Sequence, residues 1–163
     1  MLFVPLRSLA AATGGVTVWD ETSWTASVSG MTGRIASGAD YYDSDDLYWL
    51  SRIIHAESQG EPLDGKIAVG CVILNRMASE EFPDTIYEVI FDRRHGTQFT
   101  PTATGTIYNT PNAESVQAAK ICLEGYTLSE TIQYFINESI ATNTWVVYNR
   151  PYKLTIGNHD FYS

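Results

Sequence analysis

The hydrophobic positions in the middle of the chain recur at helical spacing. Leu47, Leu50, Ile54 and Glu57 follow one another at intervals of three, four and three, behind the capping and acidic residues 43–46. Prolines and glycines set further helix boundaries along the same stretch. Four helices are predicted: one from residues 43–46 to Gly60, a central one that begins at Pro62 and carries the all-apolar run 67–74, a short one that begins at Pro83, and one from Thr110 to Gly125.

The C-terminal part of the chain has a different pattern. Between the third and fourth helices, residues 93–109 are polar and rich in glycine and threonine, and we expect a loop there. Beyond Gly125 the apolar segments are short, aromatic and β-branched, which is typical of strands. Strands are predicted at residues 134–136, 145–148, 153–156 and 159–162, with turns at 149–151 and 157–158. Helices first and a small antiparallel sheet last define an α+β fold.

The first thirty residues form a separate pattern. Residues 3–15 predict a short helix, and residues 16–19 and 24–28 alternate around a polar turn, which predicts a hairpin. One helix and one hairpin cannot bury a core of their own. The chain therefore divides into a helix-hairpin fragment at 1–30, a linker rich in small residues at 31–42, and a main domain at 43–163.

Composition narrows the classes of partner. The chain has 163 residues, 44% of them hydrophobic, and ten basic against nineteen acidic residues give a formal charge of −9. Such a charge disfavours nucleic acid and anionic membranes as partners, because both are bound through clustered lysine and arginine. An uncharged or mixed-charge substrate such as a glycan fits better. No segment approaches the length of a membrane span, and we expect a monomer.

The cysteines and histidines indicate neither a disulfide scaffold nor a metal site. Cys71 and Cys122 both lie in apolar helical runs and are predicted to be small buried hydrophobes, with a disulfide between them left open. His55, His95 and His159 do not show the spacing of metal ligands. We therefore predict no metal and no cofactor.

Glu57 is the main candidate for catalysis. It lies within the apolar stripe of its helix and in the last turn, where burial and the helix dipole both act to raise the pKa of a carboxyl group. A carboxylic acid that keeps its proton near neutral pH can protonate the leaving oxygen of a glycosidic bond. The pattern alone leaves open a structural role, with Glu57 hydrogen-bonded to the next helix or paired with an arginine.

The order of several motifs resembles the SleB/CwlJ family of spore cortex-lytic and cell-wall hydrolases. The resemblance spans roughly residues 47–162 and includes the A-E-x-x-G-E segment at 56–61. It implies a lysozyme-like domain that cleaves the glycan strand of peptidoglycan, with Glu57 as its catalytic residue. The motifs that carry it are residues 52–62, 65–70, 72–76, 82–86, 98–101, 111–114, 141–145 and 156–162.

Five residues are candidates for substrate binding, and the resemblance retains three of them, Gln98, Asn137 and Trp145. Gln98 and Phe99 lie in the polar loop that we expect to face Glu57. Tyr134, Asn137 and Trp145 are expected to supply an aromatic ring for stacking on a sugar and hydrogen bonds to N-acetyl groups. From the residues alone, Phe99 is equally well explained as an anchor of its loop, and aromatic residues on short strands are more often part of a core. The chain departs from the family at His55 and Ser58, and at residues 136–138, where Ile-Asn-Glu replaces the usual Y-N-P.

The bond chemistry depends on whether a second carboxylate is present. A two-carboxylate hydrolase needs its partner about 5 Å away for retention or about 6.5–9.5 Å away for inversion. The candidates are Asp64, Asp92 and Glu61, and Glu61 is expected to cap the second helix instead. We therefore favour a lytic transglycosylase that forms 1,6-anhydro-muramic ends. A water-dependent muramidase, a peptidoglycan amidase or a catalytically silent binding module are the alternatives.

Residues 4–28 resemble part of a copper amine oxidase N-terminal-like module of bacterial surface proteins. The pattern is a V-P-L-R helix, a glycine and a V-x-W-D strand, and it implies no copper chemistry. It implies instead that the chain begins within a wall-associated module and that an export signal lies further upstream. The expected location is therefore extracellular, in the cell wall or spore cortex.

Overall fold

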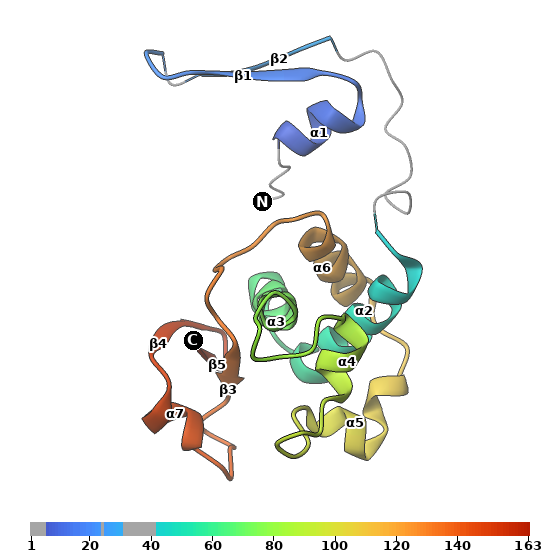
Figure 1. Cartoon of the computed structure of the whole chain (residues 1–163), viewed down its shortest axis with the longest axis vertical. Helices are drawn as coiled ribbons and strands as arrows, with labels where there is room; N and C mark the ends of the chain where they lie inside the picture. The colour runs from blue at the N-terminus through green and yellow to red at the C-terminus, as the bar shows by residue number, and fades with distance from the viewer. Residues whose placement is uncertain (1–5, 24, 31–41) are drawn as a thin grey trace. The chain divides into compact units, whose positions relative to one another are not determined.

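The computed structural model describes residues 6–23, 25–30 and 42–163. The chain divides into two compact units, Met1–Tyr42 and Asp43–Ser163. In the first unit, helix α1 (Leu6–Ala12) precedes an antiparallel hairpin of β1 (Val16–Asp20) and β2 (Thr25–Ser29) (Figure 1). The predicted helix and hairpin are confirmed. Most of the predicted linker, residues 31–41, lies outside the described residues.

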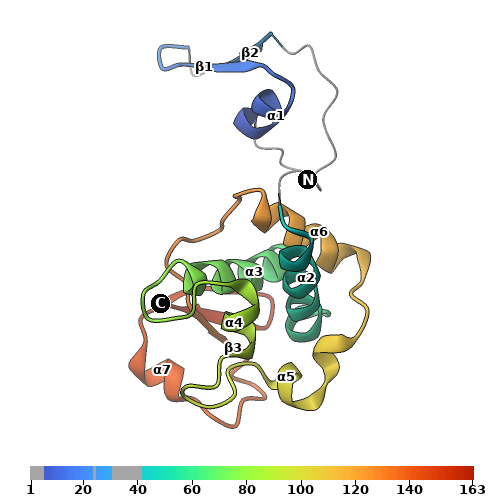
Figure 2. The same cartoon turned by 45° about the vertical axis from the view of Figure 1, so that its right-hand side comes forward.

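The second unit is built around three long helices. They are α2 (Ser44–Ser58), α3 (Leu63–Met77) and α6 (Ala113–Leu123), with the shorter α4 (Ile86–Phe91) against α2 and α3 (Figure 2). Three of these helices begin at side-chain caps, which satisfy main-chain N–H groups that would otherwise lack a partner. The caps are Asp43 on Asp45 N, Thr85 on Glu88 N and Asn112 on Ser115 N. The four predicted helices are confirmed.

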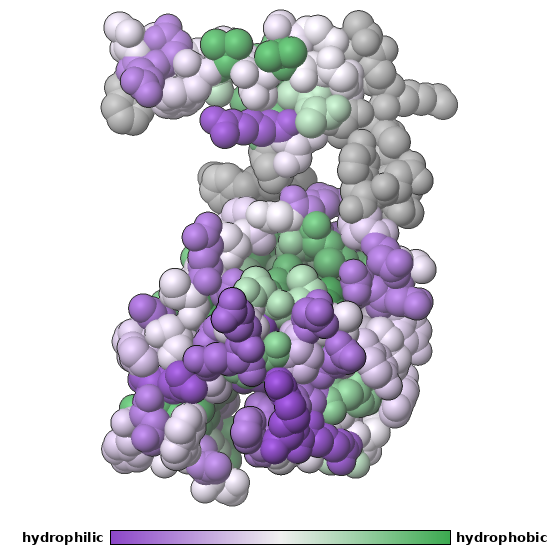
Figure 3. Space-filling model, viewed as in Figure 1, coloured by the Kyte–Doolittle hydropathy of each residue, from purple (hydrophilic) through white to green (hydrophobic). Residues whose placement is uncertain are grey.

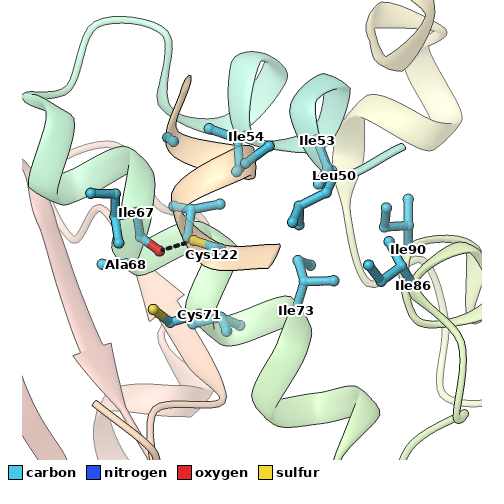
Figure 4. Packing of buried hydrophobic residues seen from close by; sticks show 14 of the residues in the cluster. Leu50, Ile53, Ile54, Ile67, Ala68, Cys71, Ile73, Ile86, Ile90 and Cys122 are labelled. Carbon is cyan, nitrogen blue, oxygen red and sulfur yellow. Dashed lines mark hydrogen bonds between the residues drawn. The ribbon is translucent and has the colours of Figure 1, made fainter. Parts of the chain in front are cut away.

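Helix α3 lies at the centre of the hydrophobic core. All residues from Gly65 to Ile73 are buried, as the all-apolar run predicts. Gly70 allows a close approach: a Cβ atom there would lie 2.7 Å from Cys122 Sγ of α6 and 3.1 Å from Ile54 Cδ1 of α2. Cys71 and Cys122 are buried free thiols, as predicted, and Cys122 Sγ lies 3.5 Å from the carbonyl oxygen of Ile67 (Figure 4).

The predicted C-terminal sheet is confirmed with one strand fewer. Strands β3 (Tyr134–Ile136), β4 (Tyr152–Ile156) and β5 (His159–Tyr162) form an antiparallel sheet in the order β3-β5-β4. The central strand β5 places the fully buried ring of Phe161 in the core. The α+β, lysozyme-like fold with a small C-terminal sheet is therefore confirmed. Among the described residues, no helix has the length and apolar character needed to cross a membrane.

Two local predictions are wrong. Residues 145–148, predicted as a strand, form helix α7 (Trp145–Asn149). The side chain of Asn143 accepts from Trp145 N, and Asn149 Nδ2 donates to the Trp145 carbonyl, so local hydrogen bonds outweigh the strand preference of the residues between them. The predicted loop at 93–109 contains α5 (Thr100–Thr104) and a 3-10 turn, η2 (Thr106–Tyr108), separated by Gly105 in the left-handed region at φ 83°.

We predict that a chain beginning at Asp43 folds alone. The core cluster of the second unit contains only residues from Leu47 onward, and Asp43 supplies the cap of α2. Its thermal unfolding, followed by circular dichroism, should remain cooperative, with a midpoint within about 5 °C of that of the full chain. Asp43→Ala in the same short chain should lower stability by about 1 kcal/mol. A short chain without a cooperative transition would contradict the division into two units.

Candidate active site

Glu57 lies near the C-terminal end of α2, one turn beyond the fully buried Ile53. Its side chain is half-buried and forms no hydrogen bond or ion pair with any described residue. Burial raises its pKa from 4.5 to about 7. Neither the main-chain hydrogen bond nor the arginine that a structural role requires is found in the part of the chain that the structure describes.

A carboxyl group with this pKa can act both as an acid and as a base. With a pKa of about 7, its acid and carboxylate forms are both populated near neutral pH. General acid and base catalysis is most efficient when the pKa of the group lies near the working pH. Glu57 can therefore donate a proton and later accept one, without a partner residue to reset it.

Glu61 is engaged in a structural contact. Its two carboxylate oxygens accept hydrogen bonds of 2.9 Å from the main-chain N–H and the side-chain amide of Asn158, in the β4–β5 turn. Burial alone raises the pKa of Glu61, but these hydrogen bonds and the nearby His159 and Lys66 outweigh it, so the pKa is lowered. The expectation that Glu61 caps α3 is wrong, because the N-cap is Pro62 and Glu61 instead joins that helix end to the sheet.

The contact between Glu61 and the turn requires a glycine. A Cβ atom at Gly157 would lie 1.8 Å from Glu61 Oε2, and the φ of Gly157 is +59°. No other residue type combines this backbone conformation with this clearance. Gly157 therefore allows the β4–β5 turn to close on Glu61.

The other two candidate carboxylates are also unsuited to act with Glu57. Asp92 forms an ion pair of 3.0 Å with Arg94, and hydrogen bonds from Arg94 lower its pKa. Asp64 is exposed in the first turn of α3. Of the carboxyl groups weighed as catalytic, Glu57 is thus the one that combines burial with freedom from a partner among the described residues.

Three of the predicted substrate-binding residues gather around Arg76, at the C-terminal end of α3. Arg76 Nη1 lies 3.4 Å from Gln98 Oε1, and the guanidinium carbon lies 5.1 Å from the ring centre of Phe99 and 5.0 Å from that of Tyr134. Phe99 is only 3% exposed and stacks on Phe135. Its position favours the alternative of a loop anchor, whereas Gln98 and Tyr134 are half-buried.

The remaining two residues lie in the segment after β3. Asn137 Oδ1 accepts from the main-chain N–H and the hydroxyl of Ser139, so its side chain shapes the turn that follows the strand. Trp145 is 50% exposed, and its ring faces Arg150 at 5.7 Å. Figure 3 shows an indentation of the surface between the region of α7 and the segment that follows α4, the two segments that carry Trp145 and Gln98.

Two arginines of this region were not predicted from the sequence as site residues. Arg76 is buried in the last turn of α3, just beyond the apolar run 67–74, and Arg150 lies between α7 and β4. A buried cation next to an apolar helical run is itself an anomaly that the sequence displays. His55 is two residues before Glu57 and therefore lies on a different side of α2, and its Nδ1 accepts from Asn112 N at 3.4 Å.

The comparisons with known proteins define the class. A model of the cell wall hydrolase family matches residues 60–162, and the chain belongs to this family. The spore cortex-lytic enzyme of Bacillus cereus is 38% identical over 120 residues, which are 74% of this chain and 45% of that enzyme. The Bacillus subtilis enzyme is 35% identical over 74% of this chain and 38% of its own length. The chain thus spans less than half the length of these relatives.

Two solved structures each match three quarters of the chain. The catalytic domain of the germination-specific lytic transglycosylase SleB from Bacillus anthracis superposes with a TM-score of 0.67 at 37% identity, covering 75% of this chain and 97% of that domain. The SleB catalytic domain of Bacillus cereus gives 0.66 at 37% identity, covering 75% and 92%. The family match begins just after Glu57, so the role of Glu57 depends on the geometry given above.

We predict that Glu57→Gln stabilises the protein above pH 7. An acid whose pKa is raised by folding holds its proton more tightly in the folded chain than in the unfolded one. The free energy of unfolding is therefore highest below pH 4.5 and falls as the pH rises to about 7. The variant lacks this loss and should be more stable at pH about 8 by ~1–3 kcal/mol, and similar to the original chain near pH 4. Urea unfolding at both pH values measures the difference. A variant that is less stable at pH 8 would indicate a structural role.

Proposed function

We propose that this chain cleaves the glycan strand of peptidoglycan as a lytic transglycosylase, with Glu57 as both acid and base. The observation that carries the proposal is the state of Glu57: a half-buried carboxyl group with a pKa of about 7 and no partner among the described residues. The fold and the family support the substrate class, because the similar structure from Bacillus anthracis is described as a germination-specific lytic transglycosylase.

The reaction needs one group that works twice. Protonated Glu57 gives its proton to the glycosidic oxygen as the bond from that oxygen to C1 of the muramic residue breaks. The resulting carboxylate then takes the proton of the C6 hydroxyl of the same residue, and the C6 oxygen bonds to C1. Glu57 recovers its proton, no water is consumed, and the product carries a 1,6-anhydro ring.

The engagement of the other carboxylates supports this route over hydrolysis. A water-dependent enzyme needs a second carboxylate to activate water or to form the glycosyl intermediate. Glu61 is held by Asn158 and Asp92 by Arg94, while Asp64 is exposed. A transglycosylase requires none of the three.

The substrate-binding residues divide by exposure. We propose that Trp145, Tyr134 and Gln98 contact the strand, because each has exposed surface. Arg76 and Arg150 also join them into one group through their contacts with Gln98 and with the rings of Tyr134 and Trp145. In this proposal the buried Phe99 anchors the loop that carries Gln98. Asn137 stabilises the turn that follows β3 through its hydrogen bond from Ser139 N. Aromatic side chains with an exposed face provide a surface on which sugar rings can pack. We further propose that the chain acts outside the cell, on the spore cortex or the cell wall.

We predict that Glu57→Gln loses activity by about 10²–10⁴-fold or more, because glutamine keeps the shape of the side chain but cannot transfer the proton. The rate of soluble muropeptide release from purified peptidoglycan measures this. Glu61→Gln is the matched control, and its effect on kcat should be less than about tenfold. Full activity of Glu57→Gln would remove the assignment of Glu57.

We predict that the products end in 1,6-anhydro-muramic acid. Mass spectrometry of the digest should therefore show muropeptides that are one water lighter than hydrolytic products, with no reducing end. Digestion in ¹⁸O-labelled water should leave these ends unlabelled. Reducing ends that carry the label, together with a large loss of activity in Asp92→Asn, would establish a two-carboxylate hydrolase instead.

A further inference from the structure

Tyr134 of β3 lies against two arginines that come from different parts of the chain. The guanidinium carbon of Arg150 lies 4.6 Å from the ring centre of Tyr134, and that of Arg76 lies 5.0 Å from it. Arg150 also faces the ring of Trp145 at 5.7 Å. Two cations therefore share one ring, and the exposed Trp145 lies at the edge of the group. We call these four residues the arginine–aromatic cluster.

No carboxylate forms an ion pair with the cluster in the described part of the chain. The ion pairs found there are Lys66–Glu114 and Arg94–Asp92, and neither includes Arg76 or Arg150. The carboxylate whose charge acts on Arg76 is Asp92, and Asp92 forms its ion pair with Arg94 instead. In a chain with a net charge of −9, two neighbouring arginines without a carboxylate partner are unusual.

The arginines also retain unused donors. Arg76 donates from Nε to the Gln133 carbonyl at 2.7 Å and from Nη1 to Gln98, which leaves Nη2 without a partner among the described residues. Arg150 Nε is buried and has no hydrogen-bond partner in the described part of the chain. A buried donor without a partner is destabilising. The cluster is therefore under-satisfied in both charge and hydrogen bonding.

The energetic effect on Arg76 is consistent with this. Burial and, to a smaller extent, the charge of Arg150 lower the pKa of Arg76 to about 10, while Tyr134 and Asp92 oppose the shift. Arg76 is still charged at neutral pH, so its desolvation is not relieved by loss of the proton. An anion placed on the cluster would offset both the burial of charge and the repulsion between the arginines.

We propose that the arginine–aromatic cluster binds a carboxylate on the side chain of a muramic residue, through the guanidinium groups of Arg150 and Arg76. The identity of the substrate rests on the proposed function. A carboxylate matches the planar fork of a guanidinium and forms paired hydrogen bonds with it. Such a carboxylate is present on the stem peptide, or on the lactyl group where the peptide has been removed. The cluster therefore acts in substrate selection, apart from the proton transfers at Glu57.

The test measures binding separately from cleavage. Soluble glycan strands are prepared with native carboxylates and with the carboxylates converted to neutral methylamides, and each is titrated into the full chain carrying Glu57→Gln. Neutralisation should raise Kd by about 10–100-fold, because a charge-assisted hydrogen bond is about twice as strong as a neutral one. With Arg150→Gln added, the Kd for native strands should already be raised, and neutralisation should change it by less than about twofold.

Controls distinguish a binding role from a structural one. Lys153→Gln removes an equivalent positive charge from an exposed position on β4 and should keep the full difference between the two strands. Arg150→Lys, which keeps the charge but not the fork, should give an intermediate difference. Repeating the titration with peptide-free strands shows which carboxylate is bound: sensitivity only in peptide-bearing strands assigns the stem peptide, and sensitivity only in peptide-free strands assigns the lactyl group.

Two results would overturn the proposal. One is an equal Kd for native and neutralised strands in the chain with Arg150 intact. The other is a loss of affinity in Arg150→Gln that is the same for both strands, which would assign Arg150 to the structure. The release of muropeptides by the chain with Glu57 intact is measured in a separate experiment. Either result would therefore overturn the carboxylate site without contradicting the proposed cleavage reaction.

Discussion

The close packing of α3 against its neighbours is the constraint on which the site depends. The helix contacts α2, α4, α6, β3 and β4, and at Gly70 it has space for no side chain between Cys122 and Ile54. Ile54 lies less than one turn before Glu57, so this contact fixes how far the carboxyl group extends beyond the core. A larger residue at position 70 would push α2 and α6 outward. The half-burial that raises the pKa of Glu57 thus depends on a glycine in the next helix.

The two ends of α3 hold the sheet in different ways. At the N-terminal end, Glu61 binds Asn158 in the β4–β5 turn, and the buried Lys66 contacts the Glu61 carbonyl and Glu114. At the C-terminal end, Arg76 donates to the Gln133 carbonyl just before β3. Buried charges are tolerated here because they are paired or hydrogen-bonded. The helical part and the sheet are thereby held together at two separated points.

The sequence predicts this fold well where periodicity and caps agree. The boundaries of α2, α3 and α6 follow from capping residues, prolines and glycines, and the burial of α3 follows from a run that is apolar on every side. The prediction of a strand at 145–148 fails because two asparagines, Asn143 and Asn149, bind the main chain locally and favour one helical turn. Glu57 could be singled out because a carboxyl group in an apolar stripe is exceptional. The contact of Glu61 with Asn158 could not be predicted from the sequence, because it joins residues that are distant in the chain. The contact of Arg150 with Tyr134 could not be predicted either, because it depends on how the backbone turns between them.

Glu57 has a pKa of about 7 in the chain without substrate, and binding of a glycan strand would raise it. A sugar placed over a half-exposed carboxyl group removes water from it, which raises the pKa further and favours the acid form. Once the leaving oxygen has taken the proton, the positive charge that develops on the sugar ring favours the carboxylate that faces it. Under the proposed mechanism, the same group is therefore more fully protonated when the strand is bound and is stabilised as a carboxylate after bond cleavage. An arginine paired with Glu57 would favour its carboxylate form throughout. No described arginine pairs with Glu57, and Arg76 lies at the C-terminal end of α3, whereas Glu57 precedes the N-terminal end of that helix. This arrangement agrees with the proposal that a single glutamate serves in both steps.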